Sequence, residues 1–229
     1  MTADRGRQRR TGEAREEILG RLETAYRAAG EGGGPAGRIA YALEPGRDPE
    51  MLLAVARERF ESQEIGYHIL PGFQSLVDSV ANHLYSRQAR LVALQPCGLF
   101  DRLDLRHGLA RRLPDLRFVD AGSGLTDVAR ADVGITACEA VIAQTGTIVL
   151  SATKREELGV SLLGGVHFCI ATVDQLTADL DSWLAGRPGW APDEATVLIS
   201  GPSRTADIEK TVVIGVHGPW KLSLFLVKE

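Results

Sequence analysis

The sequence of 229 residues is poor in cysteine, and no two cysteines stand at a metal-binding spacing. Cys97, Cys138 and Cys169 are far apart, and each lies beside an apolar, strand-like segment. A structural zinc or a typical iron–sulfur cluster needs about four ligands, usually in close pairs. We therefore expect no metal and no cofactor in this chain. Because unpaired cysteines are usual in reducing compartments, we also expect a cytoplasmic protein.

Long apolar runs and an excess of one charge are also missing. No run approaches the ~20 residues that cross a bilayer, and no apolar segment typical of a secretory signal follows the arginine-rich N-terminus. With 26 basic and 30 acidic residues, the net charge is −4. Nothing in this balance predicts a nucleic-acid partner. The 44% of hydrophobic and 24% of charged residues are ordinary for a globular protein.

Three regions follow one another along the chain. Residues 1–12 are polar and unpatterned, which predicts a disordered tail. Residues 13–47 predict an N-terminal helix followed by a loop rich in glycine (EGGGPAG), a helical appendage. Asp48 and the proline after it are typical of a helix start, so we expect the main domain to span 48–229.

Within the main domain, short apolar segments alternate with amphipathic ones. Strands are predicted at 67–70, 91–94, 117–119, 133–136, 148–150, 166–171, 196–199, 212–214 and 222–227. Helices are predicted at 73–85, 100–113, 125–131 and 174–184, besides the helix that starts at Asp48. This alternation predicts an α/β fold with a mostly parallel sheet covered on both faces. The closely spaced last strands predict a mixed edge of that sheet.

A first candidate loop lies in the segment TACEAVIAQTGTIVL. Glu139 follows a predicted strand and is a candidate acid, base or nucleophile. The Thr-Gly-Thr turn offers backbone N–H groups and two hydroxyls, which suit an anionic oxygen. A plain strand connection, with glycine at a positive φ, explains the turn equally well. The candidate ligand contacts are Gln144, Thr145, Gly146 and Thr147.

A second candidate loop is SGPSRTADIEK, between two apolar segments. A Ser or Thr at the start of a short helix favours an anion, and Arg204 offers a planar fork for a carboxylate or phosphate. Asp207 can hold that arginine, or the two can form a surface pair worth ~0–1 kcal/mol. The candidate ligand contacts are Gly201, Ser203, Arg204, Thr205, Asp207 and Glu209.

Two histidines add to these loops. His217, in GVHGP, is a candidate acid or base near neutral pH, or a structural hydrogen-bonding residue. His167 and Cys169 alternate with apolar neighbours, which indicates either a site on one face of a strand or ordinary packing. In open α/β sheets, ligands bind beyond the carboxyl ends of the strands. We therefore expect the candidate loops to form a small-anion pocket there, with Arg204 as its charge partner.

The segments GITACEAVIAQTGTIVL and VLISGPSRTADIEKTVVIGVHGP resemble the signature segments of the lactate utilization protein C family, the LUD-domain proteins. The resemblance covers roughly residues 48–229 and is sharpest after Asp132. It implies a Rossmann-like three-layer fold similar to the superfamily of glucosamine-6-phosphate isomerase, ribose-5-phosphate isomerase and CoA-transferases. It departs from the family at Gln144, where an acidic residue often precedes Thr-Gly-Thr, and glutamine cannot act as acid, base or nucleophile.

The resemblance also implies a role in oxidising L-lactate to pyruvate, as one subunit of a three-protein system whose partner proteins carry the iron–sulfur clusters. Fold alone does not assign chemistry to this subunit. Three interpretations stay open at this point: a subunit that binds a small carboxylate or phosphate, a stand-alone enzyme similar to the isomerases or CoA-transferases that uses Glu139 or His217, and a module that binds only protein.

Overall fold

The computed structural model describes residues 48–187, 194–206, 212–215 and 218–228, together with Gly20 and Gly189. The predicted tail and most of the predicted N-terminal helix and loop lie outside the described residues, and so do Asp207, Glu209 and His217. Among the described helices, none has the length and apolar character needed to cross a membrane.

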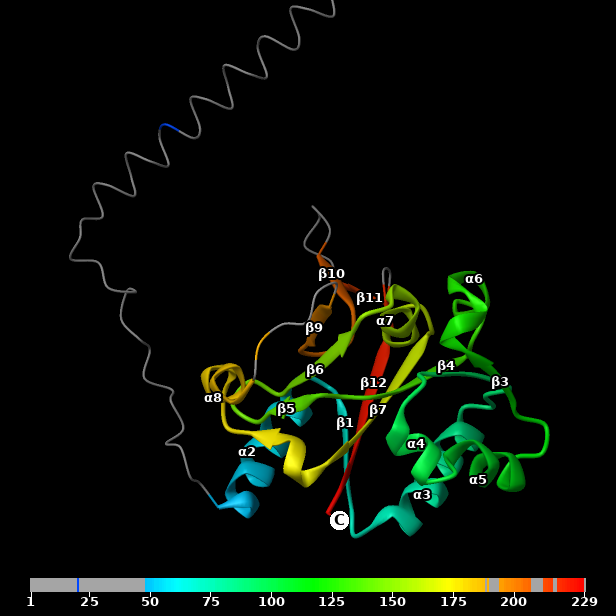
Figure 1. Ribbon diagram of the computed structural model, residues 1–229, viewed down its shortest axis with the longest axis horizontal. Coiled ribbons are helices and arrows are strands. Elements are labelled where there is room, and N and C mark those ends of the chain that lie inside the picture. The colour runs from blue at the N-terminus through cyan, green and yellow to red at the C-terminus, as the bar shows by residue number, and fades with distance from the viewer. Residues whose placement is uncertain are drawn as a thin grey trace, which may run out of the picture. The chain divides into compact units, whose positions relative to one another are not determined.

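The centre of the fold is a six-stranded sheet in the order β1-β12-β7-β4-β2-β3, and every neighbouring pair is parallel. The strands are β1 (Gly66–Leu70), β2 (Leu91–Leu94), β3 (Arg117–Asp120), β4 (Val133–Ala137), β7 (Val166–Thr172) and β12 (Lys221–Val227). β12, the last strand of the chain, lies in the interior of the sheet between β1 and β7 (Figure 1). The predicted parallel α/β fold is confirmed. All carboxyl ends of these strands meet at one edge of the sheet, which we call the carboxyl edge; the opposite one is the amino edge.

One face of the central sheet is covered by helices. They are α3 (Phe73–Ser86), α4 (Gly98–Arg102) and α5 (Leu105–Arg112). Alternate residues of β7, such as Phe168 and Ile170, are fully buried in the core that these helices share with the sheet. The single helix predicted at 100–113 is two helices, because Asp104 adopts a left-handed conformation with φ 47° between them.

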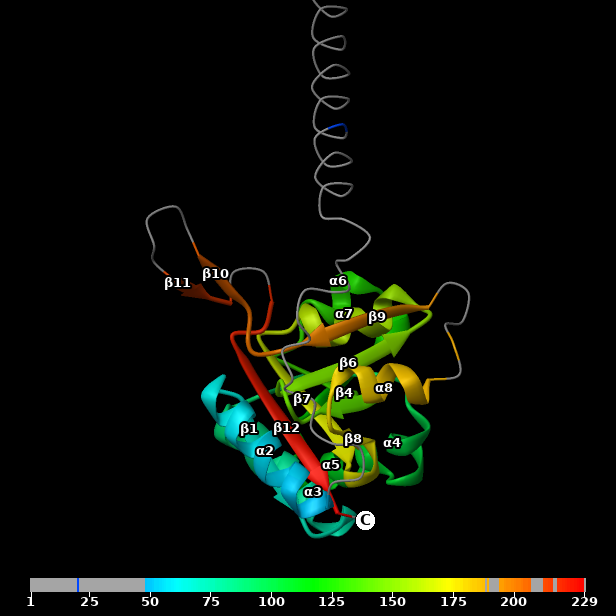
Figure 2. The ribbon, with the colours of Figure 1, turned by 90° about the vertical axis from the view of Figure 1, so that its left-hand side faces the viewer.

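The other face is covered by helices and by a second sheet. The helices are α2 (Pro49–Ser62), α6 (Leu125–Val128) and α7 (Arg155–Leu162). The second sheet has the order β8-β5-β6-β9, with β5 (Ala140–Ile142), β6 (Thr147–Ala152), β8 (Leu176–Thr177) and β9 (Ala195–Ile199). Cys169 and Ala171 of β7 face this layer. Helix α8 (Leu180–Gly186) lies beside the second sheet (Figure 2), and its Trp183 packs against β5 and β6.

Several elements differ from the sequence prediction, and residues 204–206, where a short helix was expected to start, form a strand. The antiparallel pairs do not form an edge of the parallel sheet: they lie in the second sheet and in a separate hairpin of β10 (Arg204–Ala206) and β11 (Val212–Ile214). The helix predicted at 174–184 is a 3-10 turn (Val173–Gln175), then β8, then α8. Helix α7 was not predicted, because its buried residues are consecutive, 158–161, and give no helical spacing.

Helix α7 packs against β4 at a single glycine. A Cβ atom added to Gly134 would lie 1.9 Å from the carbonyl oxygen of Val160, closer than real contacts allow. The C-terminal residues of α7 then reach the amino edge of the central sheet, where Gly164 and Gly165 precede β7. Glycine at this one position of β4 therefore sets how close the helix lies to the sheet.

Candidate functional site

The larger cavity described here, of about 910 Å³, lies at the carboxyl edge of the central sheet. Residues that end or follow β4, β7 and β12 form its walls together with the starts of α2, α3 and α4. Residues of these walls include Leu52, Phe73, Leu99, Arg102, Cys138, Gln175 and Lys228. Cavities at this edge are the usual ligand sites of parallel α/β sheets.

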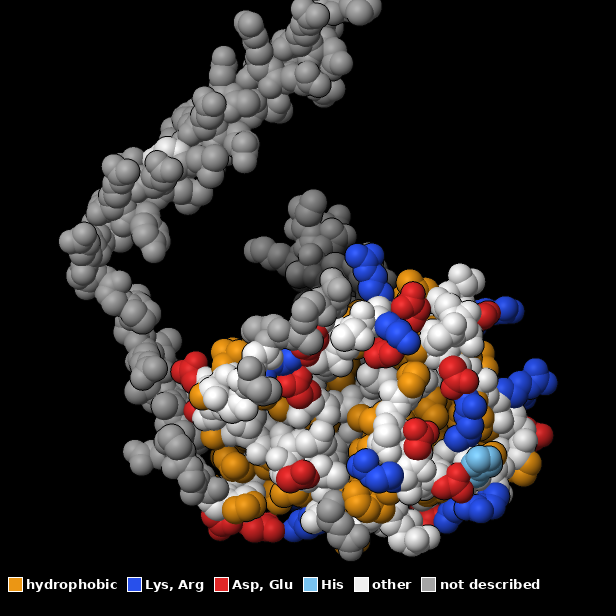
Figure 3. Space-filling view, viewed as in Figure 1, with side chains coloured by type: hydrophobic (Ala, Val, Ile, Leu, Met, Phe, Trp, Pro, Cys, Tyr) orange, Lys and Arg blue, Asp and Glu red, His pale blue; other side chains and the backbone are white. Residues whose placement is uncertain are grey.

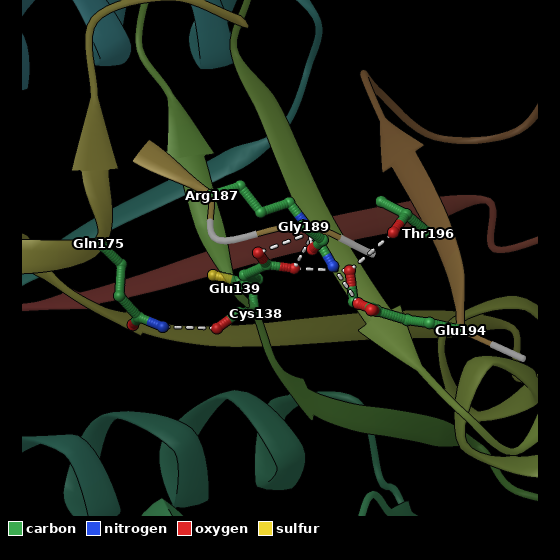
Figure 4. A network of polar contacts seen from close by, with 8 residues as sticks. Cys138, Glu139, Gln175, Arg187, Gly189, Glu194 and Thr196 are labelled. Atoms are coloured by element: carbon green, nitrogen blue, oxygen red, sulfur yellow. Dashed lines mark hydrogen bonds and ion pairs between the residues drawn. The ribbon is translucent and has the colours of Figure 1, made fainter. Parts of the chain in front are cut away.

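Gln175 fixes the wall between two adjacent strands. Its side-chain oxygen accepts hydrogen bonds from the backbone N–H and the hydroxyl of Thr172, at 2.8 and 3.1 Å. Its side-chain nitrogen donates to the carbonyl of Cys138, just after β4 (Figure 4). One amide group therefore ties the carboxyl end of β7 to that of β4, which holds this wall of the cavity in a defined position.

Two basic side chains, Arg102 and Lys228, line the cavity together with one acidic side chain, Asp174. Arg102 is exposed, and the ammonium of Lys228 pairs with Glu50 at 2.9 Å. Helix α3 starts at Phe73, in the wall, and neither a capping side chain nor an acidic residue is present in its first turn. The partial positive charge of such a helix start favours an anion. Elsewhere on the face seen in Figure 3, basic and acidic side chains are interspersed.

All three cysteines gather near this cavity. Cys97 and Cys138 line it, and the pKa of Cys138 is raised well above its usual value by a hydrogen bond with Cys169, by burial and by nearby charges. A thiol of raised pKa stays protonated and is a poor nucleophile or metal ligand. Within the described ranges, no group of three or more His, Cys, Asp or Glu side chains could hold a metal ion.

Glu139 follows β4 and lies beside the large cavity. The guanidinium of Arg187 donates to both of its carboxylate oxygens at 2.9 Å (Figure 4). The hydroxyl of Ser151 donates to one of them at 2.6 Å. Arg187 also pairs with Glu194. Only 7% of the Arg187 side chain is exposed, and its guanidinium lies 5.2 Å from the ring centre of Trp183.

This network limits what Glu139 can do. The hydrogen bond with Glu194 and the charge of Glu139 raise the pKa of Arg187 against the effect of burial, so the arginine is a permanent cation. Both oxygens of Glu139 already accept hydrogen bonds, and their use in catalysis would require these bonds to break. A hollow of about 260 Å³ beside Glu139 shares Asp174, Gln175 and Leu176 with the large cavity.

The predicted anion contacts of the Thr-Gly-Thr turn lie at the other end of the β5–β6 hairpin from Glu139. The hydroxyls of Thr145 and Thr147 are 2.8 Å apart, and that of Thr147 is 2.6 Å from the hydroxyl of Ser200. The side-chain amide of Gln63 donates to the carbonyl of Thr145 at 2.7 Å. Gly146 has φ 60°, and an added Cβ would lie 2.9 Å from Arg59. The turn therefore packs against the C-terminal end of α2.

Arg204 joins the same group. It donates to the carbonyl of Gln63 at 3.2 Å and to the carboxylate of Glu64 at 3.3 Å. Gly201, with φ 112°, also lies beside Gln63. These residues surround the C-terminal end of a helix, which carries partial negative charge, so a cation is favourable there. Arg204 thus has a helix-capping role that the sequence did not predict.

The expectation that all candidate loops share the carboxyl edge is wrong. Glu139 lies there. The group of Thr145, Thr147 and Arg204 lies instead at the amino edge, because Arg204 contacts Glu64, which comes just before the start of β1. The remaining candidates make backbone contacts: Ser203 bonds Pro219 and Gly215, Thr205 pairs with Val213, and Gln144 donates to Ala178. Asp207, Glu209 and His217 lie outside the described residues.

Sequence reasoning missed the residues around the large cavity. Arg187 and Gln175 act through partners 48 and 37 positions away, Glu139 and Cys138, and no local pattern shows such contacts. Lys228 and the Pro-Gly turn before Phe73 offered a usable signal, because each directly follows a predicted strand. Residues that follow parallel strands share the carboxyl edge, wherever they stand in the sequence.

Comparison with known proteins places the chain in a family. Residues 125–227 match the family model of the LUD domain. "Lactate utilization protein C" of Halalkalibacterium halodurans is 31% identical over 162 residues, which are 67% of this chain and 70% of that protein. The protein of the same name from Bacillus subtilis is 35% identical over 118 residues, and here the chain spans about half of the relative, 49%.

A solved structure is also similar. It is that of a DUF162 family protein from Deinococcus radiodurans, with a TM-score of 0.49 and 20% sequence identity over 79% of this chain and 99% of that one. The sequence matches are the stronger finding, since the first relative is covered over more than two thirds of its length. The chain belongs to the lactate utilization protein C family, the proteins of the LUD domain.

Proposed function

We propose that this chain is a cytoplasmic subunit of a lactate utilization system and binds a small carboxylate, L-lactate or pyruvate, in the carboxyl-edge cavity. The names of the relatives support the link to lactate. The partners in this proposal are the iron–sulfur proteins that the signature segments imply, and the reaction served is the oxidation of L-lactate to pyruvate. Under this proposal the chain binds the acid, and the partners carry the electrons.

The observation that carries the binding proposal is the setting of the cavity. An uncapped helix start, Arg102 and Lys228 supply positive charge, and Leu52 and Phe73 supply apolar contacts. A three-carbon acid has these two features, a carboxylate and a methyl group. A guanidinium that pairs with a carboxylate forms charge-assisted hydrogen bonds of ~1.5–3 kcal/mol. Since Asp174 also lines the cavity and opposes anions, the balance among these charges determines affinity.

The stand-alone enzyme needs a free acid, base or nucleophile. Glu139 is the candidate within the described residues, and Arg187 and Ser151 occupy both of its oxygens. This arrangement suits a structural link between the strand end and the segment around Arg187. The geometry therefore supports the binding subunit better than the enzyme.

Isothermal titration with L-lactate, pyruvate, a sugar phosphate and an acyl-CoA tests the proposal. We expect L-lactate or pyruvate to bind, and Arg102→Ala to weaken binding by roughly ten- to a hundredfold. Arg111→Ala is the matched control, because Arg111 is exposed on α5 and does not line the cavity. The proposal fails if neither acid binds, or if both variants weaken binding equally. Turnover of the sugar phosphate or the acyl-CoA would favour the enzyme instead.

A further inference from the structure

A second cavity, of about 230 Å³, lies at the amino edge of the central sheet, opposite the proposed carboxylate site. It is bordered by the end of α7, by β9 with the loop that follows it, and by the start of β12. Its walls are mainly apolar and include Leu162, Val197, Leu198, Pro202, Pro219 and Leu222. None of the described residues that line it carries a charged side chain at neutral pH.

One aromatic polar side chain lines this apolar space. His167 of β7 is only 1% exposed, and its Nε2 atom lies 2.8 Å from the hydroxyl of Thr136, which is itself fully buried. This is the one side-chain hydrogen bond of His167 in the described part of the structure. Burial lowers the pKa of His167 to about 3, so the ring is neutral. Its Nδ1 atom makes no hydrogen bond to a described residue and is available to a ligand.

We propose that this cavity is a binding site for a small uncharged molecule, mainly apolar, of the size of a substituted benzene ring and with one hydroxyl group. An apolar cavity of about 150 Å³ is enough to bind benzene, so the volume here leaves room for a substituent. A carboxylate would lose part of its hydration there without gaining a cation, which is unfavourable. The site therefore differs in ligand chemistry from the carboxyl-edge cavity and does not depend on the proposed function.

The hydroxyl group of the proposed ligand is inferred from the two tautomers of the His167 ring. If Thr136 donates to Nε2, then Nδ1 carries the proton and donates to the ligand. If Nε2 donates to Thr136, then Nδ1 accepts. A hydroxyl both donates and accepts, so it pairs with either tautomer. A ketone pairs with one tautomer only and is expected to bind more weakly.

The probes are 4-fluorobenzyl alcohol and 4-fluorobenzoate, which share ring and size but differ in charge. Fluorine NMR titration measures both on the full chain. Ser203→Leu fills the cavity, and the serine hydroxyl makes no side-chain hydrogen bond among the described residues, while its backbone bonds to Pro219 and Gly215 remain. Ser123→Leu is the matched control, because Ser123 is exposed and does not line the cavity.

We expect the alcohol to bind the natural protein and Ser123→Leu equally, and Ser203→Leu at least about tenfold more weakly. Benzoate is expected to bind at least about tenfold more weakly than the alcohol. His167→Phe keeps a ring but removes the nitrogens. It should weaken binding of the alcohol more than binding of fluorobenzene. No binding of the alcohol, equal binding to both serine variants, or benzoate binding as tight as the alcohol would each overturn the proposal. The Ser203→Leu variant tests the site by itself, so the proposal can be tested even if His167→Phe does not fold.

Discussion

The cavities at the two edges of the central sheet differ in size and in charge. The carboxyl edge holds a cavity of about 910 Å³ near Arg102, Lys228 and an uncapped helix start. The amino edge holds one of about 230 Å³ with neutral His167. At the amino edge, backbone segments meet directly: the N–H of Trp220 donates to the carbonyl of Gly165 at 2.9 Å. The close packing of these segments leaves little space, and that space is uncharged, so one sheet offers two different kinds of binding surface.

The largest expected effect comes from Gly134, which sets the position of α7 and so the wall of the amino-edge cavity. Gly134→Val should lower the free energy of unfolding by about 3 kcal/mol or more, because the new side chain meets the backbone of Val160. Gly122→Ala is the control, since nothing lies within 4 Å of the added Cβ atom. Urea unfolding measures both. A loss of less than 1 kcal/mol would show that α7 moves away easily.

The same variant also tests whether the two edges are independent of each other. If Gly134→Val still folds, we expect fluorobenzyl alcohol binding to be lost and lactate binding to be kept, because α7 lines only the amino-edge cavity. Loss of both would mean that the two edges are coupled through the sheet.

The second prediction is that the free energy of unfolding falls in acid because of His167. Burial lowers the pKa of His167 from 6.5 to about 3, so the unfolded chain binds more protons than the folded protein between these values. Stability from this group is fully present above pH 6.5 and falls by about 1.4 kcal/mol per pH unit below it. At pH 5 the natural protein should have lost about 2 kcal/mol, and His167→Gln should show a shallower dependence.

A second histidine acts in the same direction. Burial, and then the charges of His83 and Arg87, lower the pKa of half-buried His68 to about 4. Unfolding curves of His167→Gln, His68→Gln and the double variant from pH 7 to 4.5 separate the two. If His167→Gln has the same pH dependence as the natural protein, then His167 is not buried in its neutral form.

Features set by residues close together in the sequence could be predicted, and features set by contacts between distant residues could not. Alternating strands and helices predicted the parallel sheet, since period and turn residues are local features. The packing of α7 depends on Gly134 meeting Val160, and the Glu139 network depends on Arg187; both are contacts between distant positions. The sequence did show that the signature loops are polar. It could not show that Arg204 lies at the edge opposite to Glu139, because that requires the sheet order.

The third prediction concerns Arg204, which caps α2 at the amino edge. Arg204→Ala should lower the free energy of unfolding by ~0.5–1 kcal/mol, because the pair with Glu64 is exposed, and should leave lactate affinity unchanged. Arg204→Lys should recover part of the stability. Titration and urea unfolding of both variants check this. If lactate binds tenfold more weakly to a well-folded Arg204→Ala protein, the anion pocket expected around Thr145 and Thr147 is the right one.

The smallest effect tests the charge balance of the carboxyl edge. Glu50 holds the ammonium of Lys228 at 2.9 Å, and both side chains are largely exposed, so the pair contributes ~0–1 kcal/mol to stability. Glu50→Gln frees Lys228 for the ligand and should raise lactate affinity by roughly two- to threefold, an effect that salt reduces. Glu61→Gln is the matched control, an exposed position near the other end of α2, which reaches the amino edge. An equal change in both variants would reveal only the general effect of removing one negative charge. A change in Glu50→Gln alone would locate the carboxylate beside Lys228, at the carboxyl edge.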